Sequence, residues 1–185
     1  GTSAMAQDLT GYNNGNQYVW AAAIDMSDTY GSDDYSVQAV SLNDLFRGSG
    51  YYDEARDGAL RGGGYLFLRY LFEQAGGMTI ERDGSFTDLG GMAWIKDFFA
   101  VPETGADAVE VTTGADFQDL ALDFYTALVV SGRGLNDDPT WNFHERVEDP
   151  LTGYEHGVDT YADIHGWLQL DGPPVQPIDE ADGSL

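Results

Sequence analysis

Apolar positions are concentrated in residues 61–77, which read RGGGYLFLRYLFEQAGG. The apolar residues follow one another so closely that a helix carrying them would be apolar on most of its circumference. Such a helix belongs in the middle of a core rather than at its edge, so the pattern predicts a buried central helix over about residues 57–75. Three glycines at 62–64 each cost a helix about 1 kcal/mol relative to alanine. We therefore expect a neighbouring helix to cross closely there.

Two further segments have helical periodicity. Residues 113–130 repeat apolar positions three and four apart, with aspartates on the opposite face, and Thr113 or Asp116 is suited to cap this helix. Residues 89–99 place positions 92, 95, 98 and 99 on one apolar face, with Trp94 at the margin of that face. Thr87 or Asp88 is the expected start of this helix.

The segments between and after these helices are shorter. Residues 78–85 resemble a turn around Asp83-Gly84, and Val109–Val111 is at most a short strand. From residue 133 onward, prolines and glycines divide the chain into short pieces, which Trp141 and Trp167 are expected to pin to the helical body. The predicted fold is mainly α, an irregular helical bundle around the buried central helix with a loop-rich C-terminal extension. The predicted divisions are 1–135 for the helical subdomain, 136–171 for the extension and 172–185 for an acidic extended tail.

The charge of the chain excludes some functions. Eight Lys and Arg face 32 Asp and Glu in 185 residues, a formal net charge of −24. A surface this acidic repels phosphate backbones, which argues against nucleic-acid binding, and it attracts divalent cations or basic partners. The absence of cysteine excludes disulfides and thiolate metal sites. The sequence contains no run of 18 apolar residues, so it predicts no membrane-spanning helix. It also has no basic segment followed by an apolar one, the pattern of a signal peptide.

Candidate chemistry is sparse. Asp25, Asp28, Asp33 and Asp34 lie in and just before a polar loop with a glycine, a composition that can bind calcium, although the spacing differs from the twelve-residue EF-hand loop. An ordinary solvated loop is the alternative. A zincin helix needs His-Glu-x-x-His, but His144-Glu145 is followed by Glu148 where the second histidine belongs. The other two histidines, at 156 and 165, lie in a loop-rich region where a structural role is the alternative to a His/carboxylate site.

Three segments, taken together and in order, resemble bacterial gluzincin metallopeptidases of the hyicolysin-like type. GTSAMAQDLTGYN resembles the stretch after the third zinc ligand of that family. GGGYLFLRYLFEQAGG resembles the next core helix, and DFQDLALDFYTALVVSG resembles the later helix that closes the C-terminal subdomain. The resemblance covers about residues 1–135. It departs from the family because the helix with two histidines and the catalytic glutamate is missing.

The resemblance implies the C-terminal subdomain of a secreted bacterial zinc metallopeptidase, with Gly1 lying just beyond the last metal ligand. Zinc would come only from an upstream segment or a companion chain of the same precursor, so the chain by itself is expected to be inactive. Its part would be to form a wall of the peptide-binding cleft, with Tyr65 and His144 as candidates to stabilise the oxyanion. An exposed apolar groove along residues 61–72, or a second chain filling it, is then expected. The alternative is a non-catalytic acidic module at a cell surface or in an assembly, with calcium at the aspartate loop.

Overall fold

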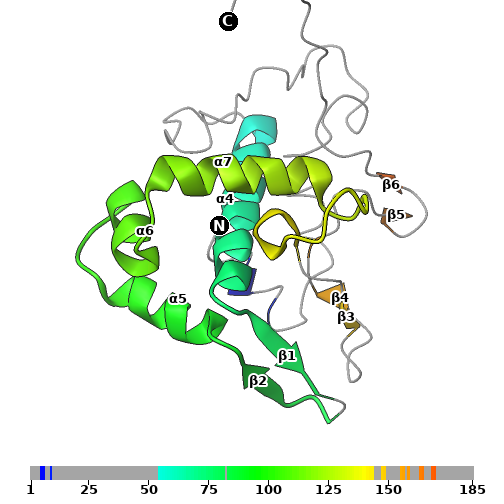
Figure 1. The fold of residues 1–185 in the computed structure, drawn as a ribbon, viewed down its shortest axis with the longest axis horizontal. Coiled ribbons are helices and arrows are strands. Elements are labelled where there is room, and N and C mark those ends of the chain that lie inside the picture. The colour runs from blue at the N-terminus through cyan, green and yellow to red at the C-terminus, as the bar shows by residue number, and fades with distance from the viewer. Residues whose placement is uncertain are drawn as a thin grey trace, which may run out of the picture.

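The structure is a computed structural model that describes residues 5, 6, 9, 54–81, 83–143, 147–148, 155–156, 158, 163–164 and 168–169, with residues 54–62 described by their backbone. This part of the chain is mainly helical, as the sequence predicts. In these residues α5, α6 and α7 pack around α4, a short hairpin projects at one edge, and a 3₁₀ turn, η2, follows the helices (Figure 1). Within these residues, no helix combines the length and the hydropathy needed to cross a membrane.

The central helix is α4, Glu54–Gln74, which begins three residues before the predicted start. Its second half is buried on nearly every side, which confirms the expectation from its apolar residues. Tyr65, Leu66, Tyr70, Leu71 and Phe72 are each at most 2% exposed. A helix in this position must be covered from several directions, and the other elements supply that cover.

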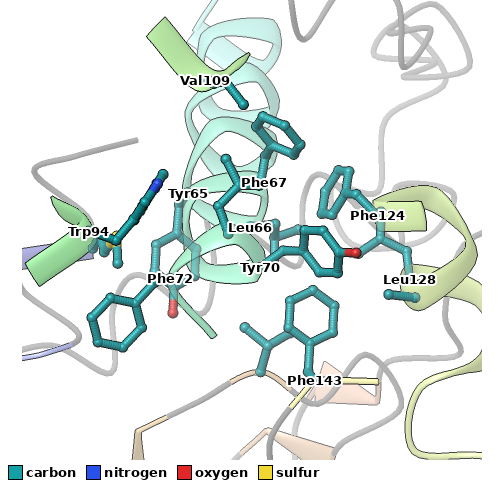
Figure 2. Close-up of a cluster of buried hydrophobic side chains, with 14 residues drawn as sticks. Tyr65, Leu66, Phe67, Tyr70, Phe72, Trp94, Val109, Phe124, Leu128 and Phe143 are labelled. Carbon is teal, nitrogen blue, oxygen red and sulfur yellow. The ribbon is translucent and has the colours of Figure 1, made fainter. Parts of the chain in front are cut away.

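The cover comes from opposite sides of α4. In Figure 2, Tyr65 and Phe72 face Trp94 of α5, whereas Tyr70 faces Phe124 and Leu128 of α7. Helix α7 is Phe117–Val130 and lies across α4 in Figure 1. The crossing is filled by aromatic rings: the ring centroids of Phe67 and Phe124 lie 5.2 Å apart and edge to face, an orientation favoured by aromatic quadrupoles.

Residues 78–85 were predicted as a turn, and that prediction was incomplete. Strand β1, Met78–Ile80, pairs antiparallel with β2, Phe86–Asp88, so the Asp83-Gly84 turn joins two strands. The Asp83 carboxylate accepts from the backbone N–H of Ser85 at 2.9 Å, which closes the turn. Strands of three residues are too short to show a period-two pattern in the sequence.

The hairpin connects α4 to α5, Gly91–Ala100. At its base, the backbone that leaves α4 lies close to the backbone that enters α5. Gly76 and Gly90 both have positive φ, of 118° and 129°. A Cβ on Gly76 would clash with the carbonyl oxygen of Leu89, and a Cβ on Gly90 would clash with that of Ala75. Glycine is therefore required at both positions by the contact and by the backbone conformation.

The predicted start of this helix at Thr87 or Asp88 was too early, because both residues lie in β2 and α5 begins at Gly91. Asp88 nevertheless covers the N-terminus of α5 from just outside the helix. Its carboxylate accepts from the backbone N–H groups of Gly90 and Met92 at 2.9 Å and of Ala93 at 3.1 Å. The prediction for Trp94 was wrong: it lies at the buried centre of the helix face, 7% exposed, whereas Phe99 is 64% exposed. Glycine at position 91 lets α5 come close to Phe72, because a Cβ there would lie 2.5 Å from the Phe72 ring. Trp94 then faces α4 (Figure 2).

The prediction of at most a short strand at Val109–Val111 was also wrong, because these residues lie within helix α6, Ala106–Thr113. Their β-branched side chains favour strands, but one helix face buries Ala108 and Val109 against the core, and packing outweighs the intrinsic preference. Gly114 ends the helix in the left-handed conformation.

Helix α7 follows α6 directly, and Asp116 is its N-cap residue. The Asp116 carboxylate accepts from the backbone N–H groups of Gln118 at 2.8 Å and Asp119 at 3.3 Å, which confirms one of the two predicted caps. The other candidate, Thr113, instead ends α6, where its hydroxyl donates to the carbonyl oxygen of Val109.

The first part of the C-terminal extension packs against α4 and α7. The turn η2, Pro139–Trp141, places Trp141 so that its indole N–H donates to the Asp123 carboxylate of α7 at 2.9 Å. Trp141 therefore pins this piece to the helical body, as predicted, whereas Trp167 lies outside the described residues. Two short antiparallel pairs follow: β3, Val147–Glu148, with β4, Glu155–His156, and β5, Asp163–Ile164, with β6, Leu168–Gln169.

Candidate functional site

Tyr65, the described member of the predicted oxyanion pair, lies inside the core. Its side chain is 2% exposed and belongs to the hydrophobic cluster around α4. The exposed apolar groove expected along residues 61–72 is not present over residues 65–67 and 69–72, because their side chains are all at most 8% exposed. Leu68 is the exception in this part of α4, being half-buried, and it leads to the strongest concave feature of the described residues.

That feature is an apolar pocket between α4, α5 and the helical residues near the N-terminus. It encloses about 210 Å³. Its lining is entirely apolar in residue type and comprises Met5, Ala6, Leu9, Leu68, Met92, Trp94, Ile95, Phe98 and Phe99. Water gains few hydrogen bonds against such a lining, so the pocket favours an apolar group over water. The pocket supplies apolar contact surface, with no acid, base or nucleophile in its wall.

Trp94 forms the inner wall of this pocket and has an unusual polar atom. Its indole Nε1 is buried without a hydrogen-bond partner among the described residues. The ring packs against Phe98, with the ring centroids 5.4 Å apart, and against the α4 face that contains Phe72 (Figure 2). An unpaired buried N–H costs about 1–3 kcal/mol. The side of the core around Trp94 is therefore less stable than it would be if this N–H had a hydrogen-bond acceptor.

A polar clasp lies on the opposite side of α4, formed by η2 with α4 and α7. The Tyr70 hydroxyl donates to the carbonyl oxygen of Thr140, and Gln74 Nε2 donates to that of Pro139, both at 2.9 Å. Burial, reinforced by the carboxylates of Asp123 and Asp138, raises the pKa of the Tyr70 hydroxyl well above its usual value. The hydroxyl therefore remains protonated, so in this arrangement it is a hydrogen-bond donor and not a base.

Helix α4 also carries a buried ion pair. Arg69 Nε lies 2.7 Å from Glu73 Oε1, one helical turn further on, and the guanidinium lies 5.4 Å from the centroid of the Phe72 ring. Both residues are at most 8% exposed. A buried pair of this kind constrains the rotation of the helix, because exposing either charge to the apolar cluster would be costly.

The remaining predicted site residues cannot be placed. His144 and the four aspartates at 25, 28, 33 and 34 lie outside the described residues. Within the described ranges, no group of three or more His, Asp or Glu side chains is arranged to bind a metal ion. The structure therefore brings together no catalytic set in the part it describes.

Comparisons with known proteins give no assignment. No family model matches the chain, no curated protein matches it, and no solved structure matches it.

Sequence reasoning missed the apolar pocket. One signal was available: α5 carries Met92, Trp94, Ile95, Phe98 and Phe99 within ten residues, more large apolar side chains than a narrow contact stripe needs. That excess indicated an apolar surface wider than one helix contact. The other wall could not be anticipated, because it needs Met5 and Leu68, which are distant from α5 in the sequence.

Proposed function

We propose that this chain is the C-terminal subdomain of a secreted, zincin-like bacterial metallopeptidase, and that it forms a wall of the cleft that binds a peptide substrate. The observation that supports this proposal is the packing of the three segments that carry the family resemblance. One hydrophobic cluster contains residues of all three segments: Met5 of the first, Tyr65, Leu66, Phe67, Tyr70, Leu71 and Phe72 of the second, and Phe124, Ala127 and Leu128 of the third.

This packing matters because the three segments are far apart in the sequence. A shared fold requires the three matched segments to meet in one core, and they do meet here. The core-facing positions of segments that pack together are selected against one another. Met5 is 3% exposed and Phe124 is 0% exposed, so each lies fully inside the shared cluster.

The proposal divides the chemistry between this chain and another segment. Zincin catalysis needs three protein ligands for zinc and a general base for the metal-bound water. Those groups would come from an upstream segment or a companion chain carrying His-Glu-x-x-His and a glutamate. This chain would supply apolar and hydrogen-bonding surface. Tyr65 and His144 remain the proposed oxyanion donors, and Tyr65 could serve only if the metal-bearing segment changes the packing around its buried hydroxyl.

The test is to express the 185 residues by themselves and also joined to the segment encoded before Gly1. We expect no zinc-dependent peptide hydrolysis from the 185 residues, and hydrolysis that a chelator abolishes and zinc restores from the joined protein. A joined protein whose catalytic glutamate is changed to glutamine is the matched control. An upstream sequence without the metal-binding motif, or zinc-dependent turnover by the 185 residues themselves, would refute the proposal.

The alternative is a non-catalytic acidic module at a cell surface, with calcium as its ligand. It is favoured by the net charge of −24 and by the four carboxylates between residues 25 and 34. It predicts that millimolar calcium raises the melting temperature, and that changing Asp25, Asp28, Asp33 and Asp34 together to asparagine removes the rise. An equal response to magnesium would indicate general screening rather than a calcium site. A flat calcium titration would exclude this alternative.

A further inference from the structure

Residues 83–143 contain far more carboxylates than cations. This stretch has eleven acidic residues, Asp or Glu, and two basic ones, Lys96 and Arg133. If both basic residues paired within the stretch, nine negative charges would remain on its 61 residues. The imbalance therefore lies in the segment from the hairpin turn to η2 and is independent of the acidic tail.

Some of these carboxylates have local backbone partners. Asp88, Asp116 and Asp138 each accept hydrogen bonds from backbone N–H groups at the start of a helix or turn. Hydrogen bonds of this kind favour the charged form, and they lower the pKa of Asp88 below its ordinary value. The Asp88 carboxylate therefore keeps its charge at neutral pH, because its backbone partners favour the charged form.

Other carboxylates stand on the surface without that compensation. Asp97, Glu103 and Asp137 are exposed, and none of them caps a helix. Helices α5, α6 and α7 also have no basic residue in their last turns, so the negative ends of their dipoles are not matched by Lys or Arg. Surface charges and helix ends thus add to the same negative potential.

The negative potential also reaches the core. Asp123 and Asp138 both contribute to raising the pKa of the buried Tyr70 hydroxyl, after the effect of burial itself. These two carboxylates lie at the clasp between η2 and the helices, where the Asp123 carboxylate accepts from Trp141. The clasp therefore places two carboxylates near one buried hydroxyl, which stays uncharged.

From these observations we infer that the folded state of this protein depends on ionic strength, with dissolved cations screening the carboxylates that its own Lys and Arg cannot neutralise. Charges on a folded surface repel one another over about a Debye length, which is about 10 Å at 0.1 M salt and about 3 Å at 1 M. Folding brings these carboxylates closer together, so the repulsion destabilises the compact state at low salt. This property is independent of the proposed peptidase role.

The test is thermal unfolding of the full 185-residue chain, followed by circular dichroism, from 0.05 to 1 M sodium chloride. Chloride is chosen because sulfate would also strengthen apolar burial. We expect the melting temperature to rise by about 10 °C or more over this range, which is several times the shift that a typical single surface substitution causes. A melting temperature that is flat or falls with salt would overturn the inference.

A charge variant separates screening from a general effect of salt. Asp97→Lys, Glu103→Lys and Asp137→Lys together change the net charge from −24 to −18. Because repulsion scales with the product of the charges, the salt dependence should fall to roughly half of that of the natural chain. The control is Asp97→Glu, Glu103→Asp and Asp137→Glu, which conserves the charge and should conserve the slope. Equal slopes for the two variants would contradict the inference.

Discussion

The two sides of α4 are packed in different ways. On the α7 side, Phe124 and Ala127 are 0% exposed, and the rings of Phe67, Tyr70 and Phe124 contact one another edge to face or tilted. The α5 side has the 210 Å³ pocket, the unpaired indole N–H of Trp94 and the exposed ring of Phe99. The comparison teaches that a helix can be buried on all sides while only one of its interfaces is fully packed.

The largest expected effect concerns the well-packed side. Phe124→Ala removes a side chain that contacts three aromatic rings, and we expect it to lower the free energy of unfolding by about 3–5 kcal/mol. Urea denaturation measures this loss. Leu122→Ala is the matched control on the same helix, because Leu122 is 65% exposed and its loss should change stability by less than about 0.5 kcal/mol. Similar losses for both variants would show that this interface is not a packed core.

The next largest effect concerns the glycine contact at the base of the hairpin, which holds α5 in position although its side chains are less tightly packed. Gly76→Ala forces a Cβ into the Leu89 carbonyl oxygen at a φ of 118°, and we expect a loss of at least about 2 kcal/mol. Gly114→Ala is the control: its φ is 72°, in the left-handed helical region, and open space surrounds the added Cβ, so the loss should be about 1 kcal/mol. Thermal unfolding of both variants compares them. If Gly76→Ala costs no more than Gly114→Ala, the close approach of Gly76 to Leu89 does not fix α5.

Enlarging one side chain on each side compares the two interfaces directly. Ala127→Leu adds atoms where Ala127 is 0% exposed, and overpacking of this kind costs about 1–3 kcal/mol. Leu68→Phe adds atoms at the wall of the apolar pocket, and we expect a change within about 0.5 kcal/mol or a gain in stability. Denaturation midpoints measure both. A large loss for Leu68→Phe would mean that the pocket has no room for further atoms.

The smallest effect concerns the cap of α5 and depends on pH. Backbone N–H groups of Gly90, Met92 and Ala93 lower the pKa of Asp88 below its ordinary value of 3.8. The carboxylate therefore stabilises the fold fully above pH 3.8, and this contribution is lost as the pH falls through the lower, folded-state pKa.

Melting temperatures of the natural chain and of Asp88→Asn, measured from pH 7 to pH 2, test this cap. The natural chain should be the more stable at neutral pH, and the difference should shrink toward the acid end. Glu103→Gln is the control, since Glu103 is exposed and caps no helix. A difference between the natural chain and Asp88→Asn that stays constant down to pH 2 would contradict this account of the cap.

The sequence predicted the elements whose signals are local. Helix α4 was found because its apolar residues are almost continuous, and α7 was found because its apolar positions recur with a helical period and Asp116 precedes them. These features depend on residues that are neighbours in the chain.

The features that the sequence did not predict depend on distant partners. Val109 lies in a helix because its side chain is buried in the cluster around α4, and local preference favours a strand. The rotation of α5 that buries Trp94 depends on Gly91 meeting Phe72. The pocket needs three segments at once, so no single stretch of sequence contains it.

The clasp at η2 determines how the α5 side and the α7 side of α4 are mechanically connected. From Tyr70 the chain passes through the hairpin, α5, α6 and α7, and then returns to Tyr70 at Thr140, 70 residues later. The hydrogen bond from Tyr70 to Thr140 thus closes a 70-residue loop of the chain, and the hydrogen bonds of Gln74 and Trp141 support the closure. A displacement of α5 can therefore affect α7 either through the side chains of α4 or along the backbone of this loop.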